Sequence, residues 1–133
     1  MDELVTILIV DDDDDCREML AAALAIEGYA AVTARSGQEA LHALRDGCVP
    51  SLILLDFYMP GMNGDAFLSE SRSMLALTEV PAIMMTSDHR ILDSVASREA
   101  NAVLRKPLRP EVVVGTIKGL LGIRSSRARI TQI

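Results

Sequence analysis

The chain has 133 residues, a length that suits one domain but not two. It contains 13 Lys or Arg and 19 Asp or Glu, which give a formal net charge of −6 at pH 7. Half of the residues are hydrophobic but only 3% are aromatic, so the core must consist of Val, Ile, Leu, Met and Ala, as is typical of layered α/β packing. No segment approaches the roughly 18 apolar residues of a membrane span, and the acidic start Met1-Asp2-Glu3 differs from a signal peptide, which predicts a cytoplasmic protein without membrane contact.

Five short apolar segments alternate with helical patterns along the chain. This alternation predicts repeated strand and helix units that build a parallel sheet. The predicted strands are Thr6–Val10, Ala30–Ala34, Leu52–Leu55, Ala82–Met85 and Ala102–Leu104. The first, third and fourth contain continuous apolar runs rather than alternating ones, as expected for strands that are buried on both faces.

The first two helices are predicted from capping-box patterns at Asp15–Glu18 and Ser36–Glu39, in which a small polar residue precedes Glu by three positions. Gly28 and Gly47 are expected to end these helices, because glycine is favoured just past a helix terminus. Apolar stripes predict the faces that turn inward, which are Leu20, Ala23 and Leu24 in the first helix and Ala40, Leu41 and Leu44 in the second.

A third helix is predicted at about Asp65–Leu75 and a fourth at about Arg90–Ala100. A fifth is expected to begin at Pro110, a favoured first helical position, and to end at Gly122. The apolar positions of the three helices are Phe67, Leu68, Met74 and Leu75, then Leu92, Val95 and Ala96, and finally Val113, Ile117, Leu120 and Leu121.

The C-terminal part of the chain differs in charge from the rest. Residues 1–104 carry 18 acidic and 6 basic groups, whereas residues 105–133 carry 7 basic groups and Glu111 as the one acidic group. The acidic body makes direct nucleic-acid binding by this domain unexpected. Residues 123–133 lack periodicity and contain three Arg, so we predict a domain over residues 1–122 followed by a basic tail or the start of a linker.

Polar side chains follow four of the predicted strands at the point where each strand ends. Asp11 and Asp12 follow the first, Asp56 the third, Thr86 the fourth, and Lys106 lies two residues after the fifth. Ligands of an open parallel sheet bind outside the carboxyl ends of its strands, so we expect these groups to converge there. The next residues in the acidic run, 13–15, are interpreted as solvated groups that the helix dipole favours.

Three carboxylates at one sheet edge require a cation. Each pair at about 4 Å repels by on the order of 4 kcal/mol at an effective dielectric constant near 20. Hard oxygen ligands favour Mg²⁺ over Zn²⁺. The soft or nitrogenous ligands that Zn²⁺ prefers are too isolated, since Cys16 and Cys48 are expected to be separate reduced thiols and His42 and His89 stand alone.

Asp56 is the candidate nucleophile, because a carboxylate can accept a phosphoryl group once a cation neutralises the incoming charge. The turn Met59–Gly64 that follows it contains two Gly and one Pro and can bring backbone groups close. We expect Mg²⁺ to bridge Asp11, Asp12, Asp56 and one phosphoryl oxygen. The hydroxyl of Thr86 and the ammonium of Lys106 would contact the other two oxygens.

Four linked motifs resemble those of response-regulator receiver domains in order and spacing, over about residues 5–122. They are Val10–Asp13, Leu54–Asp56 with Met59–Gly64, Met85–Ser87, and Lys106-Pro107. The resemblance implies a three-layer, flavodoxin-like, doubly wound sheet of five parallel strands in the order 2-1-3-4-5. It also implies that a sensor histidine kinase or a histidine phosphotransfer protein phosphorylates Asp56, and that the backbone carbonyl of Tyr58 is a further metal ligand.

By the same resemblance the protein is a two-component signalling module rather than an enzyme, although it would assist its own phosphorylation and dephosphorylation. Thr86 is the switch hydroxyl, Lys106 is the lysine that such domains use at the site, and Ser87 fits the small-residue position beside the phosphate. The output would be a contact with an effector domain or a downstream protein, or a homodimer through the face of the fourth helix, fifth strand and fifth helix.

Two positions depart from the usual pattern of such domains. Val103, three residues before Lys106, replaces the frequent Tyr or Phe, so the aromatic part of the switch is missing. Tyr58, two residues after Asp56, is bulkier than the residues common there.

Two other functions remain open at this point. A Mg²⁺-dependent phosphatase of the haloacid dehalogenase kind would use the same nucleophile, but it would want a second acid at position 58, which is Tyr. An interaction module that works without phosphorylation could retain the acidic residues, and only a labelling test separates it from a phosphoacceptor.

Overall fold

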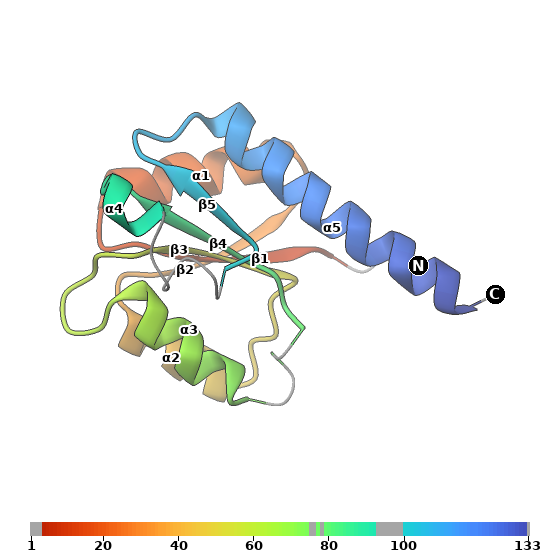
Figure 1. The fold of residues 1–133 in the computed structure, drawn as a ribbon, viewed down its shortest axis with the longest axis horizontal. Helices are drawn as coiled ribbons and strands as arrows, with labels where there is room; N and C mark the ends of the chain where they lie inside the picture. The colour runs from red at the N-terminus through yellow and green to blue at the C-terminus, as the bar shows by residue number, and fades with distance from the viewer. Residues whose placement is uncertain (1–3, 75–76, 78, 93–99, 133) are drawn as a thin grey trace.

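The computed structural model describes residues 4–74, 77, 79–92 and 100–132 of the chain (Figure 1). Strands and helices alternate from the first strand to the last helix. The elements are β1 Thr6–Val10, α1 Asp14–Ile26, β2 Ala30–Ala34, α2 Gly37–Arg45, β3 Leu52–Asp56, α3 Gly64–Arg72, β4 Ala82–Thr86, α4 His89–Leu92, β5 Ala102–Arg105 and α5 Pro110–Gln132.

The five strands form one parallel sheet in the order β2-β1-β3-β4-β5, which confirms the predicted doubly wound topology. Figure 1 shows α1 and α5 on one face of the sheet and α2 and α3 on the other. β1 and β3 are adjacent in the middle of the sheet, in the register Ile7↔Leu52 to Val10↔Leu55. The strand order therefore reverses at β1, and the carboxyl ends of β1 and β3 lie next to each other.

Two apolar clusters fill the space between the sheet and its two helical layers. Alternate residues of a strand point to opposite faces, so each central strand contributes to both clusters. Full burial of one Leu or Ile side chain stabilises the fold by about 1.5–3 kcal/mol, and most members of both clusters are completely buried. Toward α2 and α3 lie Leu8, Val10, Ile53, Leu55, Leu41 and Phe67, and toward α1 and α5 lie Ile7, Ile9, Leu52, Leu54, Leu20, Leu24, Val113 and Ile117.

The helix starts agree with the sequence in one case and differ in the other. Ser36 caps α2 as predicted, because its hydroxyl accepts a hydrogen bond from the Glu39 backbone N–H at 3.1 Å. The cap of α1 is Asp13, whose carboxylate accepts from the backbone N–H groups of Asp15 and Cys16, so the prediction that Asp15 begins the capping box is wrong. In a run of five Asp every member has the right chemistry. The Asp11 carboxylate accepts a hydrogen bond from the Asp13 backbone N–H at 3.0 Å, and the helix begins after Asp13.

Two helices are followed by the predicted glycines, whereas the third helix ends earlier than its apolar pattern predicts. Gly28 and Gly47 follow α1 and α2 with φ of +83° and +105°, as expected for residues that reverse the chain. The third helix ends at Arg72 and not at Leu75, since the Arg72 guanidinium donates to the backbone oxygens of Leu77 and Val80 and holds the returning chain against the helix end.

Several other boundaries also move. β3, β4 and β5 each extend one residue beyond the prediction, because Asp56, Thr86 and Arg105 still pair with neighbouring strands. Met74 packs against the core from beyond the end of α3, whereas Leu75 lies outside the described residues. The described part of the fourth helix is His89–Leu92, so the predicted inward positions Val95 and Ala96 lie outside it.

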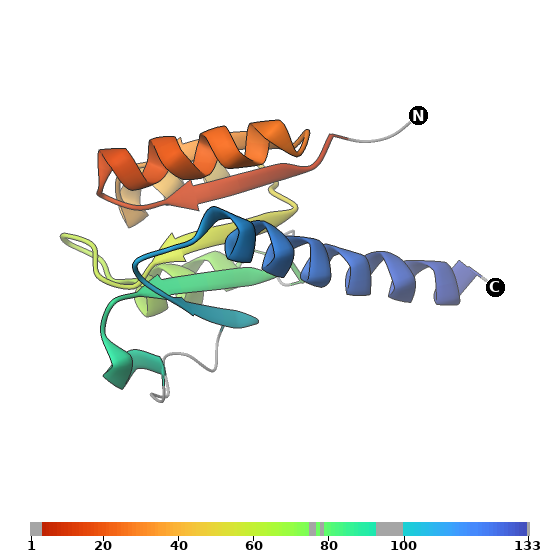
Figure 2. The same ribbon diagram turned by 90° about the horizontal axis from the view of Figure 1, so that it is seen from above.

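The fifth helix does not end at Gly122 but continues to Gln132, so the prediction of an irregular segment after Gly122 is wrong. One glycine within a helix costs only about 1 kcal/mol relative to alanine, and no proline follows that would prevent continuation. Figure 2 shows this helix running past the end of the sheet. The predicted domain boundary at residue 122 therefore lies within a helix, and it stays a prediction.

Candidate functional site

Three carboxylates meet at the carboxyl edge of the sheet. Asp11 follows β1, Asp56 is the last residue of β3, and Asp12 is the next residue after Asp11. One carboxylate oxygen of each lies within 4.8 Å of the others, and these three form the one potential metal-ligand cluster among the described residues. Asp11 is 0% exposed and Asp56 7%, whereas Asp12 faces solvent. The carboxylates of Asp11 and Asp56 are therefore shielded from water, whereas that of Asp12 lies at the solvent-exposed opening, or mouth, of the site.

The side chain of Lys106 joins two of these carboxylates. Its Nζ atom lies 3.0 Å from Asp11 Oδ2 and 3.3 Å from Asp56 Oδ2. The backbone N–H of Lys106 donates to the backbone oxygen of Thr86 at 2.9 Å. The pairing of β4 with β5 therefore holds the lysine at this edge of the sheet. One ammonium offsets one of three negative charges, and the remaining charge suits a divalent cation.

The two buried carboxylates differ in pKa although both contact Lys106. Burial alone would raise the pKa of Asp11, but hydrogen bonds from the Asp13 backbone N–H, the Cys16 thiol and Lys106 lower it below its ordinary value. Burial and the charge of Asp11 raise the pKa of Asp56 to about 6, and Lys106 offsets only part of this rise. Asp56 is thus the carboxylate whose ionisation depends most on an added cation.

Thr86 ends β4 one position beyond the residue that pairs with Asp56. It is 1% exposed, and its hydroxyl oxygen accepts a hydrogen bond from the Asp88 backbone N–H at 3.1 Å. Ser87 follows it and is exposed. The structure therefore brings the predicted hydroxyl to the same edge as the acidic cluster and gives it a partner within its own loop.

The loop after Asp56 turns tightly because Gly64 packs against the strand it has just left. A Cβ atom at Gly64 would lie 2.9 Å from the Asp56 backbone oxygen and 3.0 Å from the Phe57 Cα atom, so only glycine fits. The Gly64 N–H also donates to the Phe57 oxygen at 2.7 Å. This contact directs the segment that carries Tyr58 along the edge of the site.

The two residues that depart from the usual pattern lie on different sides of the site. The Tyr58 ring is 50% exposed, packs edge-on against Phe57 with ring centroids 4.8 Å apart, and donates its hydroxyl to Asp88 Oδ2 at 2.8 Å. Val103 is half-buried on β5, where it pairs with Met84.

Arg17, which was not among the predicted site residues, supports the acidic pair from α1. Its Nη1 atom donates to the Asp11 backbone oxygen at 2.7 Å, its Nη2 atom pairs with Asp14, and its side chain is only 12% exposed. The signal for it was present, because Arg17 lies three and seven residues before Leu20 and Leu24, on the inward stripe of the helix. A cation on an apolar stripe needs a buried partner.

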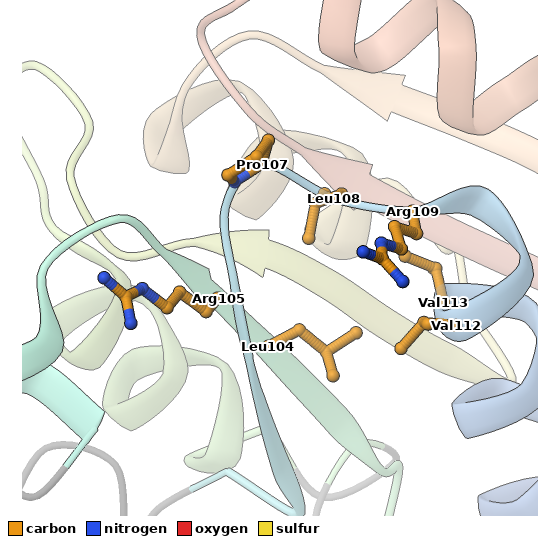
Figure 3. Close-up of a pocket in the computed structure, with 7 residues that line it drawn as sticks. All are labelled: Leu104, Arg105, Pro107, Leu108, Arg109, Val112 and Val113. Atoms are coloured by element: carbon orange, nitrogen blue, oxygen red, sulfur yellow. The ribbon is translucent and has the colours of Figure 1, made fainter.

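A separate hollow lies between β5 and the start of α5. Its volume is about 270 Å³, and Figure 3 shows aliphatic side chains of both elements around it, with Arg105 and Arg109 nearby. Both aliphatic and basic side chains line it, and none of them is a carboxylate, so it is not part of the metal cluster. Its lining residues are Leu104, Arg105, Pro107, Leu108, Arg109, Val112 and Val113.

The parallel sheet in the order 2-1-3-4-5, with helices on both faces, defines a doubly wound, flavodoxin-like α/β domain, and its acidic edge with Lys106 lies at the topological switch point. The family model "Response regulator receiver domain" matches residues 7–118. The chain belongs to the response regulator receiver domain family and is a receiver domain of two-component signalling. This assignment sets aside the haloacid dehalogenase alternative.

Similar proteins and similar solved structures are also response regulators. The "DNA-binding response regulator MtrA" of Mycolicibacterium smegmatis is 36% identical over 117 residues, which are 86% of this chain and 50% of that protein. A putative response regulator from Chloroflexus aurantiacus is 34% identical with a TM-score of 0.82, over 90% of this chain and 99% of that one. The Thermotoga maritima response regulator TrrA, solved in complex with Mg²⁺-BeF, is 30% identical with a TM-score of 0.80, over 88% and 99%.

The chain spans about half the length of the curated relatives it matches. None of the helices in the described part of the chain combines the length and the apolar character that crossing a lipid bilayer demands.

Asp56→Asn should stabilise the metal-free protein at pH 7.5 by about 1–3 kcal/mol, because a pKa of about 6 in place of the ordinary 3.8 makes ionisation in the fold costly. The folded state binds this proton more tightly than the unfolded state, so the penalty is absent below about pH 4, grows as pH rises to about 6, and is complete above it. Denaturant unfolding in EDTA at pH 7.5 and pH 4.5 measures the difference, which should shrink at the lower pH.

Asp14→Asn, at an exposed residue of the same acidic run, is the control and should change stability by no more than about 0.5 kcal/mol. Equal stability of Asp56→Asn and the wild type in EDTA at pH 7.5 would contradict the charge argument.

Arg17→Gln distinguishes two roles of Arg17, the support of Asp11 by a hydrogen bond and the balance of charge, because they predict changes of opposite sign in the affinity for Mg²⁺. Loss of a nearby cation alone would tighten the binding of Mg²⁺, whereas loss of the hydrogen bond to the Asp11 carbonyl should weaken it. We expect roughly tenfold weaker binding in a titration followed by amide chemical shifts. Arg35→Gln removes an exposed ion pair with Glu39 and should leave the affinity unchanged; tighter binding by Arg17→Gln would leave only the charge role.

Proposed function

We propose that Asp56 accepts a phosphoryl group in a Mg²⁺-dependent reaction. The observation that carries this proposal is the cluster itself, in which the Asp56 carboxylate lies within 4.8 Å of Asp11 and Asp12 and contacts Lys106 at 3.3 Å. The donors are all hard oxygens, with no His nitrogen in the cluster, and the charge balance of the edge is negative. This donor set fits Mg²⁺, which would be held by Asp11, Asp12, Asp56 and the Tyr58 backbone carbonyl.

The residues then divide the chemistry of transfer. When bound, Mg²⁺ would supply positive charge beside the phosphoryl oxygens. A carboxylate oxygen of Asp56 forms the new bond to phosphorus while the bond to the leaving nitrogen or oxygen of the donor breaks, and the leaving atom keeps the electron pair. Lys106, already in contact with Asp56, neutralises a second phosphoryl oxygen. Thr86 donates its hydroxyl to the third after it leaves its loop partner.

The donor would be a sensor histidine kinase or a histidine phosphotransfer protein in the cytoplasm, and the domain would itself assist both transfer and hydrolysis. Because the chain spans about half of its curated relatives, an effector domain in the same protein or a separate downstream protein would receive the signal. The hollow between β5 and α5, with its aliphatic and basic lining, supports a protein contact on that face, including a homodimer. The negative charge of the body argues against nucleic acid as a direct partner.

The signal would travel mainly through the backbone of residues 86–90. Val103 has a stiff β-branched side chain, so a rotamer change there moves little surface. The loop after β4, by contrast, is tied to the Thr86 hydroxyl and must respond when that hydroxyl moves.

Incubation with phosphoramidate and Mg²⁺ should add the mass of one phosphoryl group to the wild type and none to Asp56→Asn, because the amide keeps the shape of the side chain but lacks the nucleophilic charge. Intact mass spectrometry gives the count directly. Asp65→Asn, in the first turn of α3 and outside the cluster, is the matched control and should label like the wild type. Labelling of Asp56→Asn at the wild-type rate would refute Asp56 as the acceptor. A wild type that never labels would refute the assignment and favour the phosphorylation-independent module.

Tyr58→Ala should shorten the lifetime of the phosphoryl group several-fold. The half-exposed ring lies two residues after Asp56, and its removal opens the acyl phosphate to water. The decay of the labelled mass after removal of the donor measures this lifetime. Val49→Ala, an exposed apolar residue that precedes β3 at the opposite edge of the sheet, is the control. An unchanged or longer lifetime in Tyr58→Ala would rule out shielding by the ring.

A further inference from the structure

A side-chain bridge spans the mouth of the site between the loop after β3 and the loop after β4. The Tyr58 hydroxyl donates to Asp88 Oδ2 at 2.8 Å, across 30 positions of sequence. Arg90 holds the same carboxylate with its Nε and Nη2 atoms at 2.8–3.2 Å, and its backbone N–H donates to Asp88 Oδ1 at 2.9 Å. The Asp88 side chain is thereby fixed from three directions, although it lies in a surface loop.

The same loop holds the hydroxyl of Thr86. The backbone N–H of Asp88 donates to Thr86 Oγ1 at 3.1 Å, and Thr86 is 1% exposed. A rotation of the Thr86 side chain that carries Oγ1 toward a phosphoryl group on Asp56 breaks this hydrogen bond or takes Asp88 along. A fixed Asp88 therefore opposes the movement of Thr86.

We propose that Tyr58 and Asp88 are positioning residues that hold Thr86 in its resting orientation, and that this bridge sets the population of the switched state. The inference rests on the proposed phosphorylation of Asp56 and concerns how that site is regulated. In this proposal the aromatic residue of the switch lies after β3 instead of on β5. On β5 the position is occupied by Val103, whereas Tyr58, on the loop after β3, contacts Asp88 in the loop after β4.

Charge would favour opening of the bridge after phosphorylation. Hydrogen bonds from Arg90 and Tyr58 keep the pKa of Asp88 below its ordinary value, so Asp88 is an anion at neutral pH. A phosphoryl group carries about −1.5 to −2 charges and would be attached two residues before Tyr58. Repulsion between the two anions weakens the contact of Asp88 with Tyr58 and releases the Thr86 loop at the moment when the hydroxyl gains a new acceptor.

The size of the effect follows from the populations. A ligand that binds only the switched state binds more weakly by the fraction of protein in that state. If the switched state is minor, removal of one hydrogen bond from the resting state raises its population, and the apparent affinity for such a ligand, by roughly three- to tenfold.

Tyr58→Phe tests the inference, because it removes the hydroxyl but keeps the ring that would shield the phosphoryl group. The probe is beryllofluoride with Mg²⁺, titrated into uniformly ¹⁵N-labelled protein. We expect roughly three- to tenfold tighter binding, and in the free protein we expect the amides of residues 86–90 to move along the line toward their beryllofluoride-bound positions. Tyr29→Phe changes the one other tyrosine of the chain, at the turn before β2, and should change neither quantity.

A double-mutant cycle separates the bridge from a general effect of charge. Asp88→Asn should also move the free protein toward the switched state, and Tyr58→Phe should add little in its background, because the two changes break one interaction. If the wild type and Tyr58→Phe bind beryllofluoride equally well, and the amides of residues 86–90 do not shift in the free variant, this inference is overturned while the proposed function stands. Full additivity of the two variants also overturns it. A wild type that binds no beryllofluoride overturns the proposed function and this inference together.

Discussion

The contact of Lys106 with Asp11 and Asp56 is the interaction on which the rest of the site depends. It joins the segment after β5 to the ends of β1 and β3, and the pair Lys106 and Asp11 is separated by 95 positions of sequence. The lysine reaches both carboxylates because its backbone pairs with the end of β4. The charge balance of the acidic edge is therefore tied to the position of the last strand, so any change in that charge is felt at β4 and β5.

The neutralisation is incomplete, and the fold tolerates this because its stability comes from elsewhere. Continuous apolar runs in β1, β3 and β4 fill both sides of the sheet, whereas the groups of the acidic edge lie where these strands end. Burial, together with the charge of Asp11, raises the pKa of Asp56, and Lys106 offsets only part of this rise. A fully paired Asp56 would stabilise the protein more, but it would attract a cation less, so the deficit that weakens the fold would prepare the site for the function that we propose.

The sequence predicts those features that local chemistry decides, and it fails where distant groups decide. Gly28 and Ser36 could be placed because a reversed chain and a helix start each demand a particular residue type. Asp13 could not be chosen among five Asp, since all have the same capping chemistry. The acidic edge followed from parallel strand ends, but the support of Asp11 by Arg17 did not, because a polar residue on an apolar stripe does not identify its partner. The hydrogen bond between Tyr58 and Asp88 did not follow either, because adjacent strand ends bring two loops together but do not fix how their side chains are oriented.

The place of the aromatic ring changes what the site can regulate. A ring on β5 would act at a distance from the acceptor, whereas Tyr58 lies two residues from Asp56 and contacts the loop of Thr86 directly. In the mechanism that we propose, the ring would limit the access of water to the acyl phosphate, while the hydroxyl holds Asp88. Shielding and switching would then be combined in one side chain but rest on different atoms. The lifetime of a phosphoryl group on Asp56 and the population of the switched state could therefore be set independently at one position, without a moving side chain on the last strand.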